Sequence, residues 1–203
     1  MIKNCILHFH KITKHRWIVF KLCCRAGIPW RGLVHDLSKY SPTEFFEGVK
    51  YYQGNRSPLS ACKEKEGYSK AWLHHRGRNK HHPAYWYDPF AKITRPIIPY
   101  KYTVEMICDK VSASMNYNGK NWTDTSLMEY WEERNDVNIL NPQIADMLTE
   151  VFRLIAIYGV KSVITKSNLK ELYEKHTTKY NEKKQLTLER KRINIEKRIP
   201  RVG

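Results

Sequence analysis

Histidine is concentrated in the first half of the sequence. Eight of the nine histidines lie between residues 8 and 82 of a chain of 203 residues. Imidazole and carboxylate groups together bind divalent first-row transition metals, and a single helix rarely supplies a full set of ligands. The sequence therefore predicts a metal site assembled from several segments. Its candidate ligands are His15, the adjacent pair His35-Asp36, the doublets His74-His75 and His81-His82, and Asp109 farther along the chain.

The pair His35-Asp36 opens the stretch "HDLSK", which ends at Lys39. We expect this stretch to lie on a short helical segment that follows residue 29. Adjacent residues of a helix diverge by about 100°, so the pair could hold an ion only from a helix edge placed between neighbouring helices. Taken alone, the pair is typical of a polar helix surface. His15 and Asp109, as candidate neighbours, favour the metal site.

Apolar residues recur with helical spacing in several segments. The first expected helix covers residues 5–25, where His8 and His15 fall on the apolar stripe. "SPTE" is a capping box with proline at the first helical position, and it predicts a helix over 42–53. No strand pattern competes, so we predict an all-α fold, a helical bundle. Further helices are expected near residues 69–76, 100–116 and 142–158.

Two sets of polar residues have simpler interpretations than metal binding. We interpret His8 and His10 as structural or exposed. Asp109 lies four residues after Glu105, so both carboxylates occupy adjoining positions on one helix face. Such a pair could also be a solvated edge paired with a nearby lysine, which leaves Asp109 open between the two roles.

Composition separates the chain into a domain and a basic tail. We expect a helical domain over residues 1–165 and a basic tail over 166–203, either an exposed helix or partly disordered, because 166–201 carries 12 Lys and Arg against 5 Asp and Glu. The net charge of +16 favours a polyanionic partner. The five cysteines form no C-x-x-C pair, which fits a reducing cytosol. No apolar run approaches the length of a membrane-spanning helix, so we expect a cytoplasmic protein with no membrane partner.

The order of these residues resembles a known superfamily. His15, then His35-Asp36, then Asp109 is similar to the signature of the HD-domain superfamily of metal-dependent phosphohydrolases, and "HDLSK" resembles its His-Asp-x-x-Lys variant. The resemblance implies an all-helical, HD-domain-like bundle and one or two ions of Mn, Fe, Co or Zn. It assigns His15, His35, Asp36 and Asp109 to the first ion. Histidines in between, among them His75 and His82, would hold a second ion or contact phosphate, although the inward member of each doublet stays undecided.

The same resemblance implies a function. Metal-activated water would attack a nucleotide or another phosphorylated small molecule. Asp36 and Lys39 are the expected catalytic residues, with Lys39 beside the substrate phosphate. Some HD-like proteins use a di-iron centre to activate oxygen, so oxidative chemistry remains an alternative. The whole chain also looks like a group of bacterial and phage proteins with no assigned activity. Basic residues that could bind the substrate's charge are Arg31, Lys39, Arg76, Arg78 and Lys80.

A second class of function is nucleic-acid binding without catalysis by the histidines. Trp72 and Tyr85 to Tyr87 stand beside basic residues and could stack bases, and the basic tail could add salt-dependent affinity. The segment "HHRGRNKHH" also raises an HNH-like nuclease. That motif needs a β-hairpin followed by a helix and wider spacing, which the sequence does not show. Ordinary packing of a proline-rich loop is the simpler interpretation of the aromatic residues.

Overall fold

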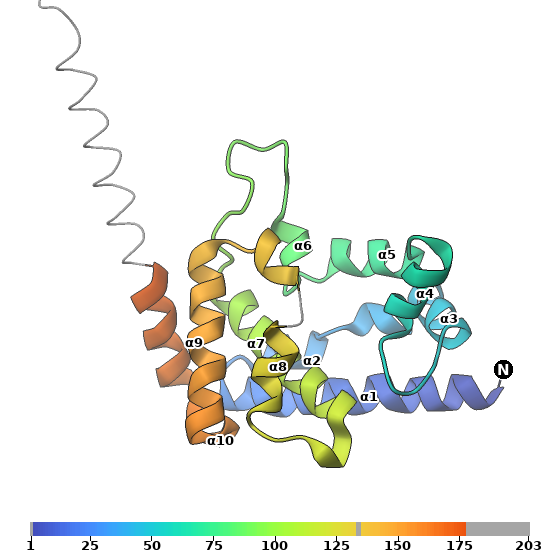
Figure 1. The fold of residues 1–203 in the computed structure, drawn as a ribbon, viewed down its shortest axis with the longest axis horizontal. Helices are drawn as coiled ribbons and strands as arrows, with labels where there is room; N and C mark the ends of the chain where they lie inside the picture. Colours follow the sequence, from blue (N-terminus) through green and yellow to red (C-terminus); the bar gives the residue numbers. More distant parts are fainter. Residues whose placement is uncertain (1, 133–134, 178–203) are drawn as a thin grey trace, which may run out of the picture.

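Helices supply all regular secondary structure in the residues that the computed structural model describes, 2–132 and 135–177, and no strand occurs there (Figure 1). The all-α prediction is confirmed. The α-helices are α1 (Ile2–Arg25), α2 (Pro29–Val34), α3 (Pro42–Lys50), α4 (Pro58–Glu66), α5 (Lys70–Arg78), α6 (Pro83–Trp86), α7 (Tyr100–Asn118), α8 (Ser126–Glu132), α9 (Pro142–Tyr158), α10 (Val160–Val163) and a helix over 166–177. Three short 3-10 helices are η1 (Leu37–Tyr40), η2 (Gly119–Asn121) and η3 (Asn135–Ile139).

Side chains cap three of the predicted helices, α3, α5 and α9, at their first turn. The Ser41 hydroxyl accepts from the backbone N–H of Glu44 at the start of α3, and the Asn141 amide oxygen accepts from Gln143 at the start of α9. These bonds satisfy N–H groups that have no partner inside the helix. The prediction for α3 was too long, because the helix ends at Lys50 rather than near residue 53.

The main hydrophobic core lies on the side of α1 and α7 that faces α8, α9 and α10. The second half of α1 contributes Val19, Leu22 and Cys23, and α7 contributes a buried stripe that includes Val104 and Val111. Burial of this apolar area fixes α1 and α7 against the rest of the domain. The sides of α1 and α7 that point away from this core therefore face the segment that runs from α2 to α6.

Helices α1 and α7 run antiparallel. His15 of α1 lies beside Asp109 of α7, while Lys11, one turn earlier on α1, donates to the carbonyl oxygen of Asn116, about two turns later on α7. The two helices therefore form a continuous seam. Polar and charged residues of the N-terminal half of α1 face those of the C-terminal half of α7 along it.

The first part of the predicted tail is helical and packs on the core. Residues 166–177 form a helix beside α9 (Figure 1), with Leu169 fully buried and Leu172 nearly so. The Tyr173 hydroxyl donates to the backbone oxygen of Ile98, which ties this helix to the chain just before α7. Residues 166–177 thus extend the helical domain past the predicted boundary at 165. The remainder of the predicted tail, 178–203, lies outside the described residues.

Within residues 2–132 and 135–177, none of the helices has the length and apolar character needed to cross a lipid bilayer.

Candidate metal centre

Four of the predicted ligands meet beside the seam of α1 and α7. The Nε2 atoms of His15 and His35 lie 3.4 Å apart, and Asp109 Oδ1 is 3.1 Å from His15 Nε2 and 3.6 Å from His35 Nε2. Asp36 Oδ2 closes the group at 3.3 Å from His35 Nε2 and 3.8 Å from His15 Nε2. Each residue thus directs one donor atom at a common point. We call His15, His35, Asp36 and Asp109 the first cluster.

The backbone at Asp36 explains how adjacent residues converge. The prediction of a helix through His35 and Asp36 was wrong, because α2 ends at Val34 and His35 has φ −55° and ψ 129°. Asp36 then adopts the left-handed region with φ 52°, which side chains other than glycine rarely adopt. In a helix the two side chains would diverge, but this break turns both of them into the same buried space. Strained backbone of this kind is often found at functional sites.

A second group of donors meets on the other side of Asp36. His75 Nε2 lies 3.3 Å from Asp36 Oδ1, and His81 Nε2 lies 3.4 Å from the same oxygen. His82 Nε2 faces His75 Nε2 at 2.8 Å. Helix α5 supplies His75, and the turn between α5 and α6 supplies both His81 and His82. We call Asp36, His75, His81 and His82 the second cluster.

These distances suit two metal ions that share one carboxylate. Ligand atoms about 2.0–2.2 Å from an ion, at angles of 90–110°, are about 2.8–3.6 Å from one another. Most separations in both clusters fall in this range. Asp36 turns Oδ2 to the first cluster and Oδ1 to the second. The buried His/Asp sets of this chain can therefore hold metal, with Asp36 common to both.

Unsatisfied polar atoms support the same conclusion. Both oxygens of Asp36 and the Nε2 atom of His81 are buried without a hydrogen bond among the described residues, although Lys39 Nζ forms an ion pair with Asp36 Oδ2 at 2.7 Å. Buried polar groups are ordinarily paired, since leaving one unpaired costs about 1–3 kcal/mol. Cations placed between these donors would satisfy them.

A buried carboxylate orients two of the histidines from behind. Glu105 Oε1 lies 3.1 Å from His35 Nδ1 and 3.3 Å from His81 Nδ1, while its other oxygen pairs with Arg31 at 2.7 Å. A ligand histidine commonly donates its second ring nitrogen to such a group, which fixes the ring and its tautomer. Glu105 is fully buried, so the alternative of a solvated Glu105–Asp109 edge is wrong.

A second carboxylate decides the His74-His75 doublet. Glu44 Oε2 lies 2.7 Å from His75 Nδ1, which leaves His75 Nε2 for the second cluster. His74 instead directs its Nδ1 to Glu44 Oε1 at 2.6 Å and stays outside the cluster. For His15, the hydroxyl of Ser112 lies 3.0 Å from Nδ1 and plays the corresponding part. All five cluster histidines thus direct Nε2 inward.

Burial and neighbouring charges favour an ionised carboxylate at Asp36 and a neutral imidazole at His82. Burial raises the pKa of the Asp36 carboxyl, but His35, Lys39 and His75 more than offset this and hold the pKa well below its usual range. Burial, with His81 and His75 nearby, holds the pKa of His82 well below its usual value. A carboxylate and a neutral imidazole are the forms that bind a metal ion.

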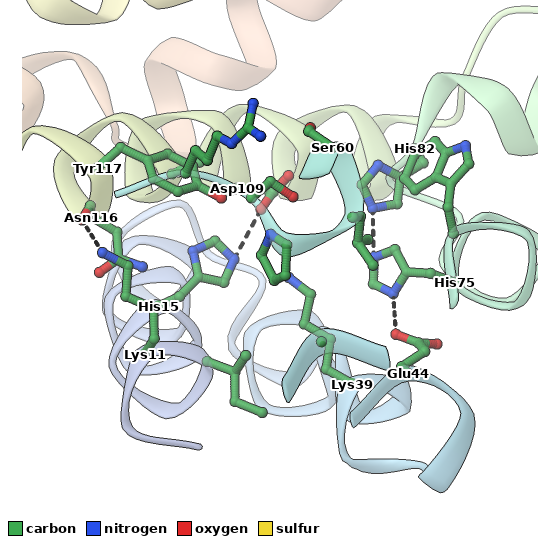
Figure 2. Close-up of a pocket in the computed structure, with 18 of the residues that line it drawn as sticks. Lys11, His15, Lys39, Glu44, Ser60, His75, His82, Asp109, Asn116 and Tyr117 are labelled. Carbon is green, nitrogen blue, oxygen red and sulfur yellow. Dashed lines mark hydrogen bonds and ion pairs between the residues drawn. The ribbon is translucent and has the colours of Figure 1, made fainter. Parts of the chain in front are cut away.

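A cavity of about 260 Å³ opens directly onto the centre. His15 and Asp109 of the first cluster and His75 and His82 of the second line it, and Figure 2 shows these pairs at two neighbouring points of one pocket. Lys39 also lines the cavity. A ligand in the cavity would therefore reach both clusters and an ammonium group together.

Four predicted substrate-binding residues lie elsewhere, among them Arg31, which pairs with Glu105 and does not line the cavity. Arg76, Arg78 and Lys80 are not among the residues that line the cavity. Arg76 and Arg78 are exposed on α5, and Lys80 Nζ lies over the rings of Tyr85 and Tyr102. Helix α5 directs His75 inward, so residues 76 and 78 of the same helix point in other directions.

The histidine-rich segment also bears on the other hypotheses. Residues 69–87 form α5, a turn and α6, with no β-hairpin, so the fold that an HNH-like nuclease needs is absent from this described segment. Trp72 lines the cavity, and Trp86 donates to the backbone oxygen of Lys80. Nucleic-acid binding by these residues stays a prediction.

The sequence did not settle the role of several residues in and around the centre. His81 was open as one half of a doublet, and Glu44 and Glu105 received no role beside the histidines. His8 was interpreted as structural or exposed; it is buried, lines the cavity and belongs to neither cluster. Its position on the α1 stripe with His15 was a signal for this location. Glu44 had no such signal, because its place at the start of α3 is typical of a capping box.

Comparison with known proteins gives a family but no activity. A family model described as "Family of unknown function (DUF5662)" matches residues 5–154, which include both clusters. No curated protein matches the chain. No solved structure matches it either. Because the match covers most of its length, the chain belongs to the family of unknown function DUF5662.

Proposed function

We propose that this protein is a metal-dependent phosphohydrolase that acts on a nucleotide or another phosphorylated small molecule. The observation that carries the proposal is the carboxylate of Asp36, which faces two sets of inward imidazoles at the wall of a cavity. We further propose that the occupants are two divalent ions of Mn, Fe, Co or Zn. The order of the ligands along the chain resembles the HD-domain superfamily, and this resemblance supports the phosphate chemistry.

The two clusters would each bind a metal ion. The first cluster would hold one ion and the second cluster the other, with Asp36 shared between them. Divalent ions so held lower the pKa of a water and neutralise phosphate oxygens. In the reaction, a water oxygen bonds to phosphorus, the ester P–O bond breaks, and the leaving oxygen takes up a proton.

Lys39 would stabilise the charge of the substrate. Burial lowers the pKa of its ammonium, but Asp36 and Asp109 more than offset this, so the pKa is raised and Lys39 remains a cation. A fixed positive charge at the wall of a largely enclosed site stabilises the negative charge of a phosphoryl group more strongly than it would in water. Glu44 and Glu105 would act through the histidines, by fixing ring orientation rather than by touching the substrate.

The test starts with elemental analysis of the purified protein, followed by phosphate release from a panel of nucleotides, sugar phosphates and phosphodiesters. Absence of a bound transition metal, with no gain in thermal stability on adding Mn²⁺ or Fe²⁺, would sink the proposal. A metal-loaded protein inactive on the whole panel would also count against phosphate chemistry. It would return attention to the oxidative alternative, which oxygen consumption by the iron-loaded protein measures.

Lys39→Met separates chemistry from metal binding. The variant should keep its metal and lose turnover by about 10²-fold, because an electrostatic contact to the transition state is removed while no cluster atom changes. Lys14→Met is the matched control, since Lys14 is an exposed lysine on α1 that does not line the cavity. Equal turnover in the two variants would remove Lys39 from the mechanism.

A further inference from the structure

The cavity continues away from the metal centre along the seam of α1 and α7. Lys11 and Ile12 of α1 line this end of the cavity, as do Asn116 and Tyr117 of α7. Figure 2 shows Lys11, Asn116 and Tyr117 gathered at one end of the pocket, while His75 and Glu44 lie at the other. We call Lys11, Asn116 and Tyr117 the distal group. The mechanism above gives these residues no part.

Lys11 is a partly buried cation without an acidic partner. Its Nζ donates to the backbone oxygen of Asn116 at 2.8 Å and lies 5.5 Å from the centre of the Tyr117 ring. Among the described residues, no carboxylate lies within ion-pair distance of it. A neutral carbonyl accounts for one of the three ammonium protons, so the charge itself is uncompensated. Partial burial and the nearby Lys14 lower the pKa of Lys11, which is the direction expected of a cation that lacks a counter-ion.

Two other basic residues of the cavity wall, unlike Lys11, each have a carboxylate partner. Arg56 forms an ion pair with Glu64 at 2.7 Å, and Lys39 forms one with Asp36 at the same distance. Lys63, the remaining basic residue of the wall, has its Nζ 4.4 Å from the centre of the Trp72 ring and takes part in further interactions. Of the lysine and arginine residues that line the cavity, Lys11 therefore has the least negative charge around it among the described residues.

Asn116 adds an unpaired amide at the same place. The residue is only 8% exposed, and its Oδ1 is buried without a hydrogen-bond partner in the described chain. Oxygen and nitrogen of an amide exchange places on a half-turn, so this end of Asn116 can offer a donor to a ligand. A buried amide without a partner is costly, and Asn116 lines the cavity together with Lys11.

The distance between the two ends limits the size of a ligand. Asp109 of the first cluster and Asn116 both lie on α7, seven residues apart, which is about 10 Å along the helix axis. On α1, His15 and Lys11 are four residues apart in the opposite direction of the chain, about 6 Å along the axis, and the Lys11 side chain extends to the backbone oxygen of Asn116. A molecule whose phosphate reaches the clusters would therefore present its far end to the distal group.

We propose that the distal group binds a second anionic group of the substrate, so that the preferred substrate is a phosphate ester with a further phosphate or carboxylate about 10 Å away. This inference rests on the proposed phosphohydrolase function for its first phosphate. Lys11 supplies the charge and Asn116 supplies an amide donor. Charge-assisted contacts of this kind, placed in a partly dry site, contribute specificity for a substrate with two charged ends.

The test uses three synthetic phosphate esters of equal chain length with Mn²⁺-loaded protein. They are 1,6-hexanediol bisphosphate, 6-phosphonooxyhexanoate and 1,6-hexanediol monophosphate, which end in phosphate, carboxylate and hydroxyl. We expect kcat/KM for an anionic ester to exceed that for the alcohol by about 10- to 100-fold. Preference for the bisphosphate alone identifies a phosphate site, whereas preference for both identifies a general anion site. Equal values for all three would overturn the inference and leave the phosphohydrolase proposal standing.

Variants locate the preference. Lys11→Met should reduce it to less than about 3-fold while hydrolysis of the monophosphate is maintained, and Lys11→Arg should restore much of it because the charge returns. Lys14→Met is the control, because Lys14 is exposed and lies about one helical turn after Lys11 on α1. This variant should leave the preference unchanged. A preference that survives Lys11→Met would assign the second anion to another residue and contradict the proposal.

Calorimetry separates failure of this inference from failure of the proposed function. In Mn²⁺-loaded protein, 1,6-hexanediphosphonate should bind about 10-fold more tightly than hexylphosphonate, and Lys11→Met should remove the difference. This result without any turnover would keep the distal group as an anion site and reject phosphate hydrolysis. Equal affinities in the wild-type protein would reject the distal group whether or not the esters are hydrolysed.

Discussion

Asp36 should be the one ligand whose replacement empties both halves of the metal centre. Asp36→Asn keeps the size of the side chain but replaces the carboxylate that faces His15 and His35 through one oxygen and His75 and His81 through the other. An amide is a weak ligand and cannot bridge two cations by charge. We therefore expect the variant to lose both ions, although each half keeps its imidazoles.

The same change should also destabilise the metal-free fold. Among the described residues, the Asp36 carboxylate forms an ion pair with Lys39 Nζ at 2.7 Å, and the Asp36 side chain is 1% exposed. Removing one partner of a buried ion pair costs about 3–5 kcal/mol. Because the Lys39 side chain is 26% exposed, solvent offsets part of this cost, and we expect about 3 kcal/mol. For a domain of this size that corresponds to a fall in Tm of about 6–12 °C.

Metal stoichiometry is the decisive measurement. Elemental analysis after loading with Mn²⁺ should give two ions per wild-type chain and none in Asp36→Asn. Asp109→Asn is the matched control, because Asp109 belongs to the first cluster alone and its loss should leave one ion. Equal metal content in the two variants would refute the shared role of Asp36. Thermal unfolding in the presence of chelator measures the stability difference separately.

Three further predictions follow from contacts around the clusters. His81→Ala should lose the second ion whereas His74→Ala should keep both, because only His81 faces Asp36; equal metal content would contradict this assignment. Burial raises the pKa of Glu105, but His35 and the other ring beside it lower it to about 2 from its usual 4.5. Stability of the chelated protein, followed by urea unfolding, should then fall by about 3 kcal/mol as pH drops from 4.5 to 2. Glu105→Gln should flatten that slope, and an unchanged slope would assign it elsewhere. Gly48→Ala should lower the Tm by a few degrees or displace the His8 ring in the cavity, because the new Cβ would lie 2.3 Å from His8 Nε2. An unchanged Tm and an unchanged cavity would contradict the tight packing.

Much of the fold was accessible from the sequence because it depends on local patterns. The stripe that carries His15 predicted α1, and the caps at Ser41 and Asn141 predicted where α3 and α9 begin. Apolar spacing and helix caps act within a few residues of one another, so no knowledge of distant partners is needed. The absence of strand patterns likewise gave the all-α class. The HD-like details of the bundle stay a prediction.

The candidate site was accessible in part. Residue types and their clustering singled out His15, His35, Asp36 and Asp109 as possible ligands, and the structure brings them within 3.8 Å of one another along the contacts described above. A helix through residues 35 and 36 was expected, however, because no local sequence pattern predicts that Asp36 adopts a left-handed backbone conformation. Choosing between members of a histidine doublet needs the direction of the chain at that point, which local spacing does not supply.

The sequence alone thus determined the all-helical class, the positions of the main helices and the residue types available for metal chemistry. Only the tertiary structure decided that Asp36 faces two clusters, that His81 is turned inward while His74 is not, and that Glu44 and Glu105 hold the rings from behind. It also placed Arg76 and Arg78 away from the cavity and Lys11 within it. The physical reason is range: helix formation follows from neighbours in the sequence, whereas a ligand set depends on side chains brought together across as many as 94 residues, from His15 to Asp109.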